Sequence, residues 1–324
     1  MVSPASVRPV RASQTSAASA QKTWAHLRII ERIGEGAFGE VYRAFDPRRG
    51  GDVALKVLRA GVSSEPPQVR VIRESRNLGR VQHPNVVAVY GARASVKRAG
   101  FWMELIRGTT LTELLRALGP FTVERAAIIG CDLCRALAAV HEAGVVHGDV
   151  KAQNVMREKG GRVVLMDFGS SRCPEHNRTG LERLTGTPAY LAPEVLSGTE
   201  PCIASDVYSL GVLLFHLVTG DYPVQGGSAD EIRRAHASRS VRRVTDLHGG
   251  LPDAFVRAVD GALSPADSRY RNTDDLLAVL RQVRISSSID GSIFDSVFEP
   301  SAAMAAAETA KASLLEQTRT FSLA

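Results

Sequence analysis

The stretch HGDVKAQNV, residues 147–155, decides how the rest of this sequence is interpreted. Within it, Asp149, Lys151 and Asn154 supply a carboxylate, an ammonium group and a carboxamide close together. A loop for phosphoryl transfer needs such groups to orient the attacking hydroxyl and to balance the charge of a phosphate. Gly148 lies directly before the aspartate, and whether the loop is active depends on the segments around it.

The bulk composition is typical of an ordinary soluble globular protein. The chain has 324 residues, of which 44% are hydrophobic and 23% are charged. This length is sufficient for two lobes or domains. The net charge of +6 is mild, so the composition indicates neither a nucleic acid nor a membrane surface as a partner.

Neither a membrane span nor a secretory signal is expected. The longest apolar stretch, residues 207–220, contains His216 and is shorter than the roughly 18–20 residues that a membrane helix needs. We expect it to be a buried core helix. Residues 1–23 lack the apolar region of a secretory signal peptide. The chain is therefore predicted to be cytoplasmic.

The four cysteines are too few for a disulfide framework. Cys131 and Cys134 form a CxxC pair, but neither a second pair nor histidines at ligand spacing follow, so zinc is not expected. The surrounding residues show helical apolar periodicity. This pattern favours two reduced thiols packed on a helix, as in a cytoplasmic protein.

Composition divides the chain into three parts: residues 1–23, 24–284 and 285–324. The first is rich in Ser, Ala and Thr and is predicted to be disordered, and the last is a low-complexity tail. In the central part, the residue pattern predicts strands at 27–33, 40–45, 52–58, 85–92 and 101–105. It predicts helices at 68–81, 110–118, 123–144, 205–220, 229–238, 253–263 and 273–283. A strand-rich front and a helix-rich back indicate an α+β protein with two lobes.

Two features of the strand-rich part suggest a phosphate site. The stretch GEGAFGEV, residues 34–41, places three glycines between two strands, whereas in dinucleotide folds such a loop leads into a helix. Lys56 lies on the next strand among apolar residues, and burying an unpaired ammonium group is costly. Nucleotide phosphates and Glu74, on the following helix, are the expected partners of Lys56.

Further motifs follow in a recognisable order: HGDVKAQN, then MDFG at 166–169 and TPAYLAPE at 187–194. With this series the chain resembles the protein-kinase family, and specifically the bacterial Ser/Thr kinases of the eukaryotic type, from about Leu27 to Arg284. The resemblance implies a two-lobed fold with an N-lobe at 24–103, a hinge at 104–108 and a C-lobe at 109–284. It also implies that ATP and Mg²⁺ are used to phosphorylate Ser or Thr hydroxyls of protein substrates, in signalling and in autophosphorylation.

The resemblance assigns the nucleotide site residue by residue. The positions that match the family's nucleotide-binding residues are Gly34, Gly36, Gly39, Val41, Ala54, Lys56, Met103, Glu104 and Ile106. The glycines would cover the phosphates, and Lys56 would contact the α and β phosphates. Met103 matches the gatekeeper position, and the backbone of Glu104 and Ile106 would receive the adenine.

The resemblance also assigns the catalytic groups. Asp149 would accept or orient the proton of the attacking hydroxyl, and Lys151 would steady the transferring phosphoryl group. Glu74 would hold Lys56 in place, and Asn154 and Asp167 would hold magnesium. Several residues match the family's framework instead: Leu78, Val89, His147 and Phe168 as an apolar column between the lobes, Asp206 beneath the catalytic loop, and Glu194 with Arg269 as a buried pair.

Two other functions remain open from the residues. Aminoglycoside and choline kinase-like phosphotransferases also carry HGD followed by an asparagine, which makes a small-molecule kinase an alternative. Lys151, Gly169 and the stretch 187–194 favour protein substrates. An ATP-binding pseudokinase scaffold is the other alternative, but it would require the loss of an essential group, and none is missing.

Gly148 replaces an arginine that, in the family, normally pairs with a phosphate on the activation loop. The substitution suggests a kinase that does not depend on such a phosphate at Ser170, Ser171, Thr179 or Thr185. The sequence does not set the oligomeric state, and a homodimer remains open.

Overall fold

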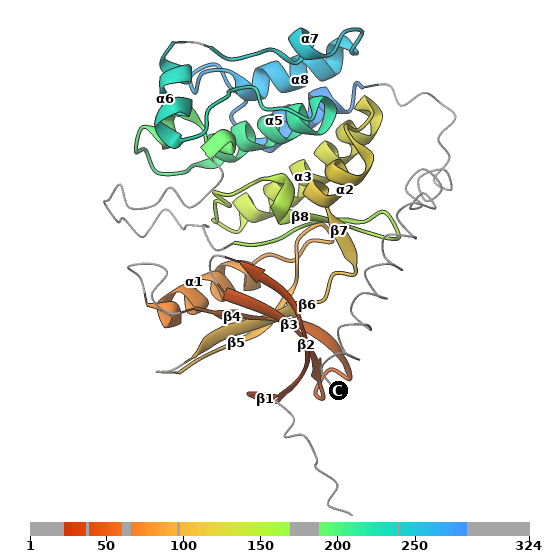
Figure 1. The fold of residues 1–324 in the computed structure, drawn as a ribbon, viewed down its shortest axis with the longest axis vertical. Coiled ribbons are helices and arrows are strands. Elements are labelled where there is room, and N and C mark those ends of the chain that lie inside the picture. Colours follow the sequence, from red (N-terminus) through yellow and green to blue (C-terminus); the bar gives the residue numbers. More distant parts are fainter. Residues whose placement is uncertain are drawn as a thin grey trace, which may run out of the picture.

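The computed structural model describes residues 23–36, 39–59, 66–95, 98–168, 188–238 and 240–283. Outside these ranges lie both predicted tails, apart from Thr23, and the residues Gly169, Ser170, Ser171, Thr179 and Thr185. Thr23 begins strand β1 (Thr23–Trp24), so the predicted end of the first tail is wrong by one residue. Figure 1 shows a lower lobe built on a sheet and an upper lobe of helices.

The N-lobe is one antiparallel sheet with the strand order β1-β2-β3-β4-β6-β5. Its longer strands are β2 (Leu27–Gly36), β3 (Gly39–Asp46), β4 (Gly51–Leu58), β5 (Val89–Ala94) and β6 (Ala99–Glu104). Helix α1 (Pro67–Gly79) packs against β5 and β6. The fold class and the predicted strands at 27–33, 40–45, 52–58 and 101–105 are confirmed.

Strand β4 is buried on both faces, which explains its almost continuous apolar sequence. Val53 and Leu55 pack with Trp24 and Leu27 in a small cluster on one face of the sheet. Because side chains alternate along a strand, Lys56 lies on the opposite face. The strand therefore places Lys56 in the interior. On that side of the sheet it is contacted by Asp167 of the C-lobe.

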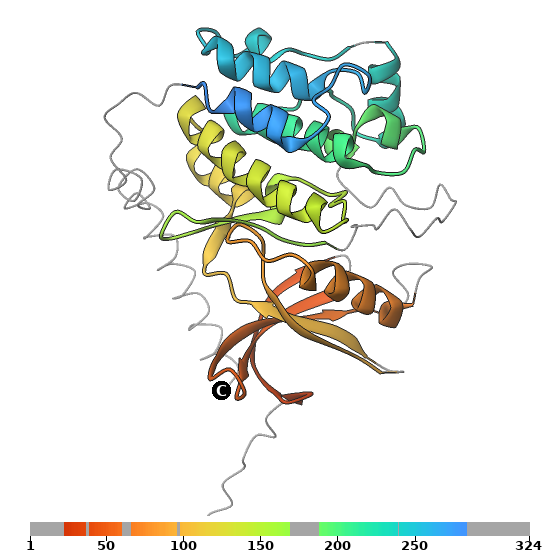
Figure 2. The ribbon, with the colours of Figure 1, turned by 180° about the vertical axis from the view of Figure 1, so that it is seen from behind.

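The C-lobe is built around helix α5 (Ile203–Thr219), the apolar stretch that the sequence assigned to a core helix. Helices α3 (Val123–Glu142) and α8 (Asp253–Leu263) pack against α5, and α9 (Thr273–Leu280) packs against α3 and α8; Figure 2 shows these helices from behind. Each of these was predicted, with ends that shift by a few residues at most. Within the described ranges, no helix is both long and apolar enough to cross a membrane.

Smaller elements complete this lobe. They are α2 (Leu111–Leu118), α4 (Pro193–Leu196), α6 (Ala229–Ala237), α7 (Val244–Leu247), η1 (Ala152–Asn154) and η2 (Pro188–Tyr190). A three-stranded sheet of β7 (Gly108–Thr110), β8 (Val155–Glu158) and β9 (Val163–Leu165) lies between the helices and the N-lobe (Figure 1). Helices α2 and α6 were predicted, whereas this sheet and the short helices α4 and α7 were not.

Local sequence signals account for several boundaries. Thr110 and Glu113 form the predicted capping box at the start of α2, with the Glu113 amide 3.2 Å from Thr110 Oγ1. Helix α5 ends at Thr219 and is capped by Gly220, which adopts a left-handed φ of 72° that glycine tolerates best. Cys134 is buried on α3 and Cys131 is half-buried, and both thiols are free, as the helical pattern predicted.

The predicted strand at 85–92 is wrong in its first half, because β5 begins only at Val89. Val86 instead forms a parallel bridge with Leu165 of β9. The Asn85 side chain donates a hydrogen bond of 2.7 Å to the Val163 carbonyl. Contacts across the lobes thus outweigh the local strand pattern, and the loop after α1 is held against the C-lobe.

The predicted pair of Glu194 and Arg269 forms and is bidentate, but only Arg269 is buried, whereas Glu194 is partly exposed. Arg269 is fully buried, and its two terminal nitrogens lie 2.5 and 3.1 Å from the Glu194 carboxylate oxygens. Arg269 also donates to the carbonyls of Ala204 and Ser264, both at 3.0 Å. Loss of Glu194 would leave the buried charge of Arg269 without its carboxylate partner, so this contact is part of the C-lobe's framework.

Candidate active site

Lys56 lies at the junction of the two lobes and pairs with two carboxylates. Its Nζ is 3.1 Å from Glu74 Oε1 on α1 and 2.6 Å from Asp167 Oδ1, which follows β9 in the C-lobe. Burial alone would lower the pKa of Lys56, but the charges of Asp167 and Glu74 outweigh it and raise the pKa above its usual value. The predicted Lys56–Glu74 pair is confirmed, and the contact with Asp167 is an addition.

Asp167 adopts an unusual backbone conformation. Its φ of 62° lies in the left-handed region, which non-glycine residues seldom adopt and which tends to occur at functional sites. Phe168, the next residue, is buried, and its ring centroid lies 4.5 Å from that of His147. Leu78 is buried in the same core and Val89 packs against that core, so the positions agree with the predicted apolar column, of which the His147–Phe168 contact is observed directly.

The catalytic loop brings its three polar side chains together. Lys151 Nζ is 2.7 Å from Asp149 Oδ2, and Asn154 Nδ2 is 2.9 Å from the same oxygen. Asn154 Nδ2 also donates to the Asp149 carbonyl at 2.8 Å. The Asp149 carboxylate is thereby held at one oxygen by two donors, which fixes its orientation, as its predicted role toward a hydroxyl would require.

Asp206, on α5, holds this loop in the position that the resemblance implied. Its carboxylate accepts the amides of His147 and Gly148 at 2.9 and 2.8 Å, and His141 Nε2 lies 2.8 Å away. Gly148 has a φ of 74°, which L-residues adopt at a cost of about 1–2 kcal/mol. A glycine at position 148 therefore suits the turn that this carboxylate holds.

The His147 ring connects the catalytic loop with the segment that carries Asp167. The Asp149 amide donates to Nδ1 at 3.2 Å, so Nε2 carries the proton and donates to the Met166 carbonyl at 3.1 Å. The Met166 amide donates in turn to the Asn154 carbonyl at 2.8 Å. The backbone segments of Asn154 and Asp167, the two predicted magnesium ligands, are therefore adjacent.

These two residues fit a magnesium ion bound together with phosphates. One carboxylate and one carboxamide oxygen are ligands that Mg²⁺ accepts, and Mg²⁺ commonly takes its remaining ligands from water and substrate phosphate. In the part of the chain that the structure describes, no cluster of three or more His, Cys, Asp and Glu side chains could hold a metal ion by itself. A nucleotide would have to complete the site.

The register of the N-lobe sheet places the predicted nucleotide residues on one face. Val41 is the cross-strand partner of Lys56, and Ala54 is the partner of Met103. Cross-strand partners share a face, and so do residues two apart on one strand. These four residues thus face the same side of the sheet, and β6 ends at Glu104, where the hinge begins.

The three glycines of the stretch 34–41 lie at the facing ends of β2 and β3 and have different surroundings. A Cβ on Gly39 would lie 2.1 Å from the Val57 carbonyl oxygen, so the sheet itself requires glycine there. A Cβ on Gly36 would have no atom within 4 Å, and one on Gly34 would meet Val41 Cβ at an ordinary 3.7 Å. The lack of side chains at Gly34 and Gly36 leaves the backbone open to a ligand.

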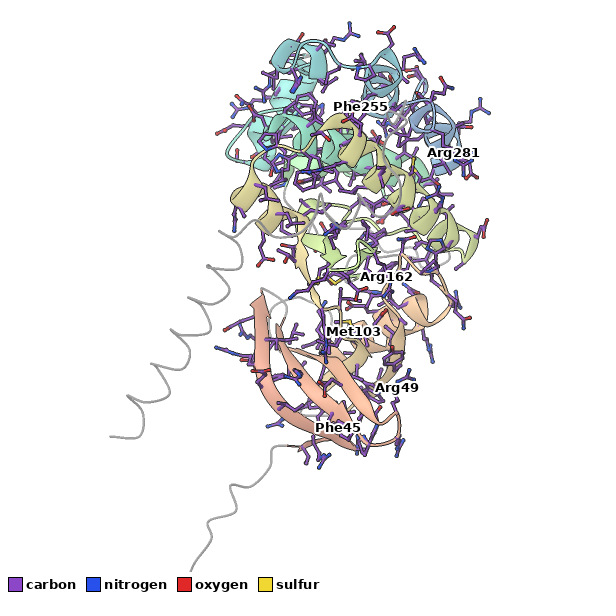
Figure 3. The ribbon with its side chains drawn as sticks, turned by 90° about the vertical axis from the view of Figure 1, so that its right-hand side faces the viewer. Phe45, Arg49, Met103, Arg162, Phe255 and Arg281 are labelled. Atoms are coloured by element: carbon purple, nitrogen blue, oxygen red, sulfur yellow. The ribbon has the colours of Figure 1, made fainter. Side chains whose placement is uncertain are left out.

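One polar residue at this junction was missed from the sequence. Arg162, between β8 and β9, pairs with the carboxylate of Glu104 at the end of β6. Figure 3 labels Arg162 at the level where the two lobes meet. Sequence reasoning assigned a role only to the backbone of Glu104, and the stretch around Arg162 carries no local signal of this partner.

A comparison with known protein families agrees with this geometry. The family described as "Protein kinase domain" matches residues 27–282. This match covers most of the chain and includes both the sheet with Lys56 and the loop with Asp149. The chain belongs to the protein kinase family.

Curated relatives include bacterial serine/threonine-protein kinases. The chain is 34% identical to PknB of Mycobacterium tuberculosis over 262 residues, which cover 78% of the chain and 42% of PknB. It is 35% identical to PkaA of Streptomyces coelicolor over 271 residues, covering 79% of the chain and 49% of PkaA. It is also 35% identical to PknE of Mycobacterium bovis over 255 residues, covering 78% of the chain and 45% of PknE. The chain thus spans less than half the length of these relatives.

The surroundings of Asp149 predict a pH dependence. Burial raises the pKa of this carboxyl above its usual value, and the charge of Lys151 only partly counteracts that effect. In its predicted role as the base Asp149 must be deprotonated, so this role predicts that kcat/KM for peptide phosphorylation falls as the pH drops through this pKa. The Lys151→Met variant removes the positive charge that lowers the pKa of Asp149. The fall of kcat/KM on the acid side of the pH profile (its acid limb) should therefore occur at higher pH in this variant.

The measurement is the pH profile of kcat/KM at saturating ATP for wild type and variant. Lys159→Met, at an exposed position in the turn between β8 and β9, is the matched control and should leave the limb in place. An acid limb that stays unmoved in Lys151→Met, or that moves to lower pH, would contradict the assignment of Asp149 as the base.

Proposed function

We propose that this chain is an ATP- and magnesium-dependent kinase that phosphorylates Ser or Thr hydroxyls of proteins. The observation that carries the proposal is that Lys56 pairs with Glu74 and Asp167, and that Met166, directly before Asp167, is hydrogen-bonded to His147 and Asn154 of the loop that carries Asp149. The family membership and the names of the relatives support the same class of reaction. Free thiols on α3 and the use of ATP fit the cytoplasm as its location.

In the proposed reaction, Asp149 orients the substrate hydroxyl and accepts its proton. The hydroxyl oxygen bonds to the γ-phosphorus as the bond to the β-phosphate oxygen breaks, and ADP leaves. Lys56 contacts the α and β phosphates, and Lys151 balances the charge of the transferring group. Magnesium, held by Asn154 and Asp167, would supply further charge stabilisation.

The Asp149→Asn substitution tests the reaction directly. Purified protein is incubated with γ-labelled ATP, magnesium and a mixture of Ser- and Thr-containing peptides. Label should enter protein or peptide with the wild type and fall by about 10²–10⁴-fold in the variant, the usual contribution of a general base. Nucleotide affinity should persist, because Asp149 lies in the C-lobe and not on the sheet face of Ala54 and Met103.

The control is Asp253→Asn, at an exposed position at the start of α8, which should keep full transfer. Label that enters small alcohols or amino sugars but not peptides would favour the small-molecule alternative. Nucleotide binding without any transfer by the wild type would favour the scaffold. Equal transfer by Asp149→Asn would contradict the role of this residue.

We also propose that a loop phosphate is dispensable, because Gly148 offers no side chain to bind it. A variant with alanine at Ser170, Ser171, Thr179 and Thr185 should therefore phosphorylate peptide at a largely unchanged rate. Near-total loss of activity in a variant that melts at the wild-type temperature would show that a loop phosphate is needed after all.

A further inference from the structure

The guanidinium of Arg162 joins three segments that are distant in the sequence. Its two terminal nitrogens lie 2.5 and 3.0 Å from the Glu104 carboxylate oxygens at the end of β6. Its Nε donates to the Pro84 carbonyl at 2.6 Å, in the loop between α1 and β5. We call Arg162, Glu104 and Pro84 the interlobe clamp. It ties the turn between β8 and β9 in the C-lobe to the last strand before the hinge.

Backbone bonds around the clamp fix the same three segments. The Glu104 amide donates to the Ala88 carbonyl at 2.8 Å, and the Val87 amide donates to the Leu165 carbonyl at 3.1 Å. The Leu165 amide donates to the Asn85 carbonyl at 2.8 Å. Glu104 is therefore held at its backbone by one of these segments and at its side chain by another.

The charges of the clamp are shielded more than those of a surface pair. The Arg162 and Glu104 side chains are only 31% and 23% exposed. Burial would raise the pKa of Glu104, but the hydrogen bonds and charge of Arg162 outweigh it and lower the pKa below its usual value. A two-pronged arginine–carboxylate pair sets orientation as well as distance, so the clamp restricts how the end of β6 can turn.

We propose that Arg162 is a positioning residue for the nucleotide, acting through Glu104 on the backbone of the hinge. The inference rests on the proposed adenine site at this segment. The transfer groups Lys56 and Asp149 have partners of their own, which loss of the clamp leaves in place. The end of β6, by contrast, would lose the restraint on the Glu104 side chain and keep only its backbone bonds, such as the one from the Glu104 amide to Ala88, so the hinge would hold the adenine less firmly.

The test separates nucleotide affinity from chemistry. Arg162→Met keeps an unbranched stem and removes every guanidinium donor. The KM for ATP and the Kd for ADP should rise about five- to tenfold, as expected for the loss of charge-assisted hydrogen bonds, whereas kcat should stay within about twofold. Arg243→Met removes a more exposed contact, in which two nitrogens bond to Asp260, and should change neither constant.

A double-mutant comparison identifies the partner. Glu104→Gln alone should raise the KM for ATP by a similar factor, and adding Arg162→Met should raise it little further, because both changes remove the same charged pair and the other contacts of Arg162, with Pro84 and Glu158, do not reach the hinge. Arg162→Lys, which keeps the charge but not the two-pronged geometry, should give an intermediate KM. Should Arg162→Met fail to fold, the Glu104→Gln and Arg162→Lys variants carry the same comparison.

An unchanged KM for ATP in Arg162→Met, or a drop in kcat at constant KM, would overturn the proposal. The adenine site is checked separately with Met103→Gly and ATP that carries a benzyl group on N6. The variant should use this analogue and the wild type should reject it. Failure there would overturn the adenine placement and the clamp's role together, whereas success with an unchanged KM in Arg162→Met would overturn the clamp alone.

Discussion

The structure depends on how the ammonium group of Lys56 is neutralised in the interior. A buried charge of this kind is tolerated only when it is paired and hydrogen-bonded. One partner, Glu74, comes from α1 of the N-lobe, and the other, Asp167, comes from the segment after β9. The same contacts that stabilise Lys56 therefore set the position of α1 and bring the two lobes together at the nucleotide site.

A second buried carboxylate organises the opposite side of the site. Asp206 accepts two successive backbone amides of the catalytic loop, and the loop then presents Asp149 to Lys151 and Asn154. Gly148 takes part through its amide and its positive φ, and no side chain at that position is needed to shape the loop. Gly148 in place of the family's arginine is thus compatible with the close grouping of Asp149, Lys151 and Asn154.

Most of the fold and much of the site could be predicted from the sequence. Strand and helix periodicity located the main elements, and the order of the motifs paired Lys56 with Glu74. What escaped prediction depends on tertiary contacts between short segments. The side chain of Asn85 bonds to Val163 of the C-lobe, and the apolar residues after Asn85 therefore form a loop between the lobes where the sequence pattern predicted a strand. Arg162 binds Glu104, which lies 58 positions away in the sequence. Neither contact is visible in the periodicity of the sequence.

The most direct test of this arrangement is the rate of γ-phosphoryl transfer to peptide by Lys56→Met, measured beside its affinity for ATP. Transfer should fall by about 10²–10³-fold, as when a preorganised charge is removed from an active site, while ATP still binds. Lys159→Met, at an exposed lysine, should transfer at the wild-type rate. A Lys56→Met variant that transfers phosphate as fast as wild type would contradict the central role given to this buried ammonium group.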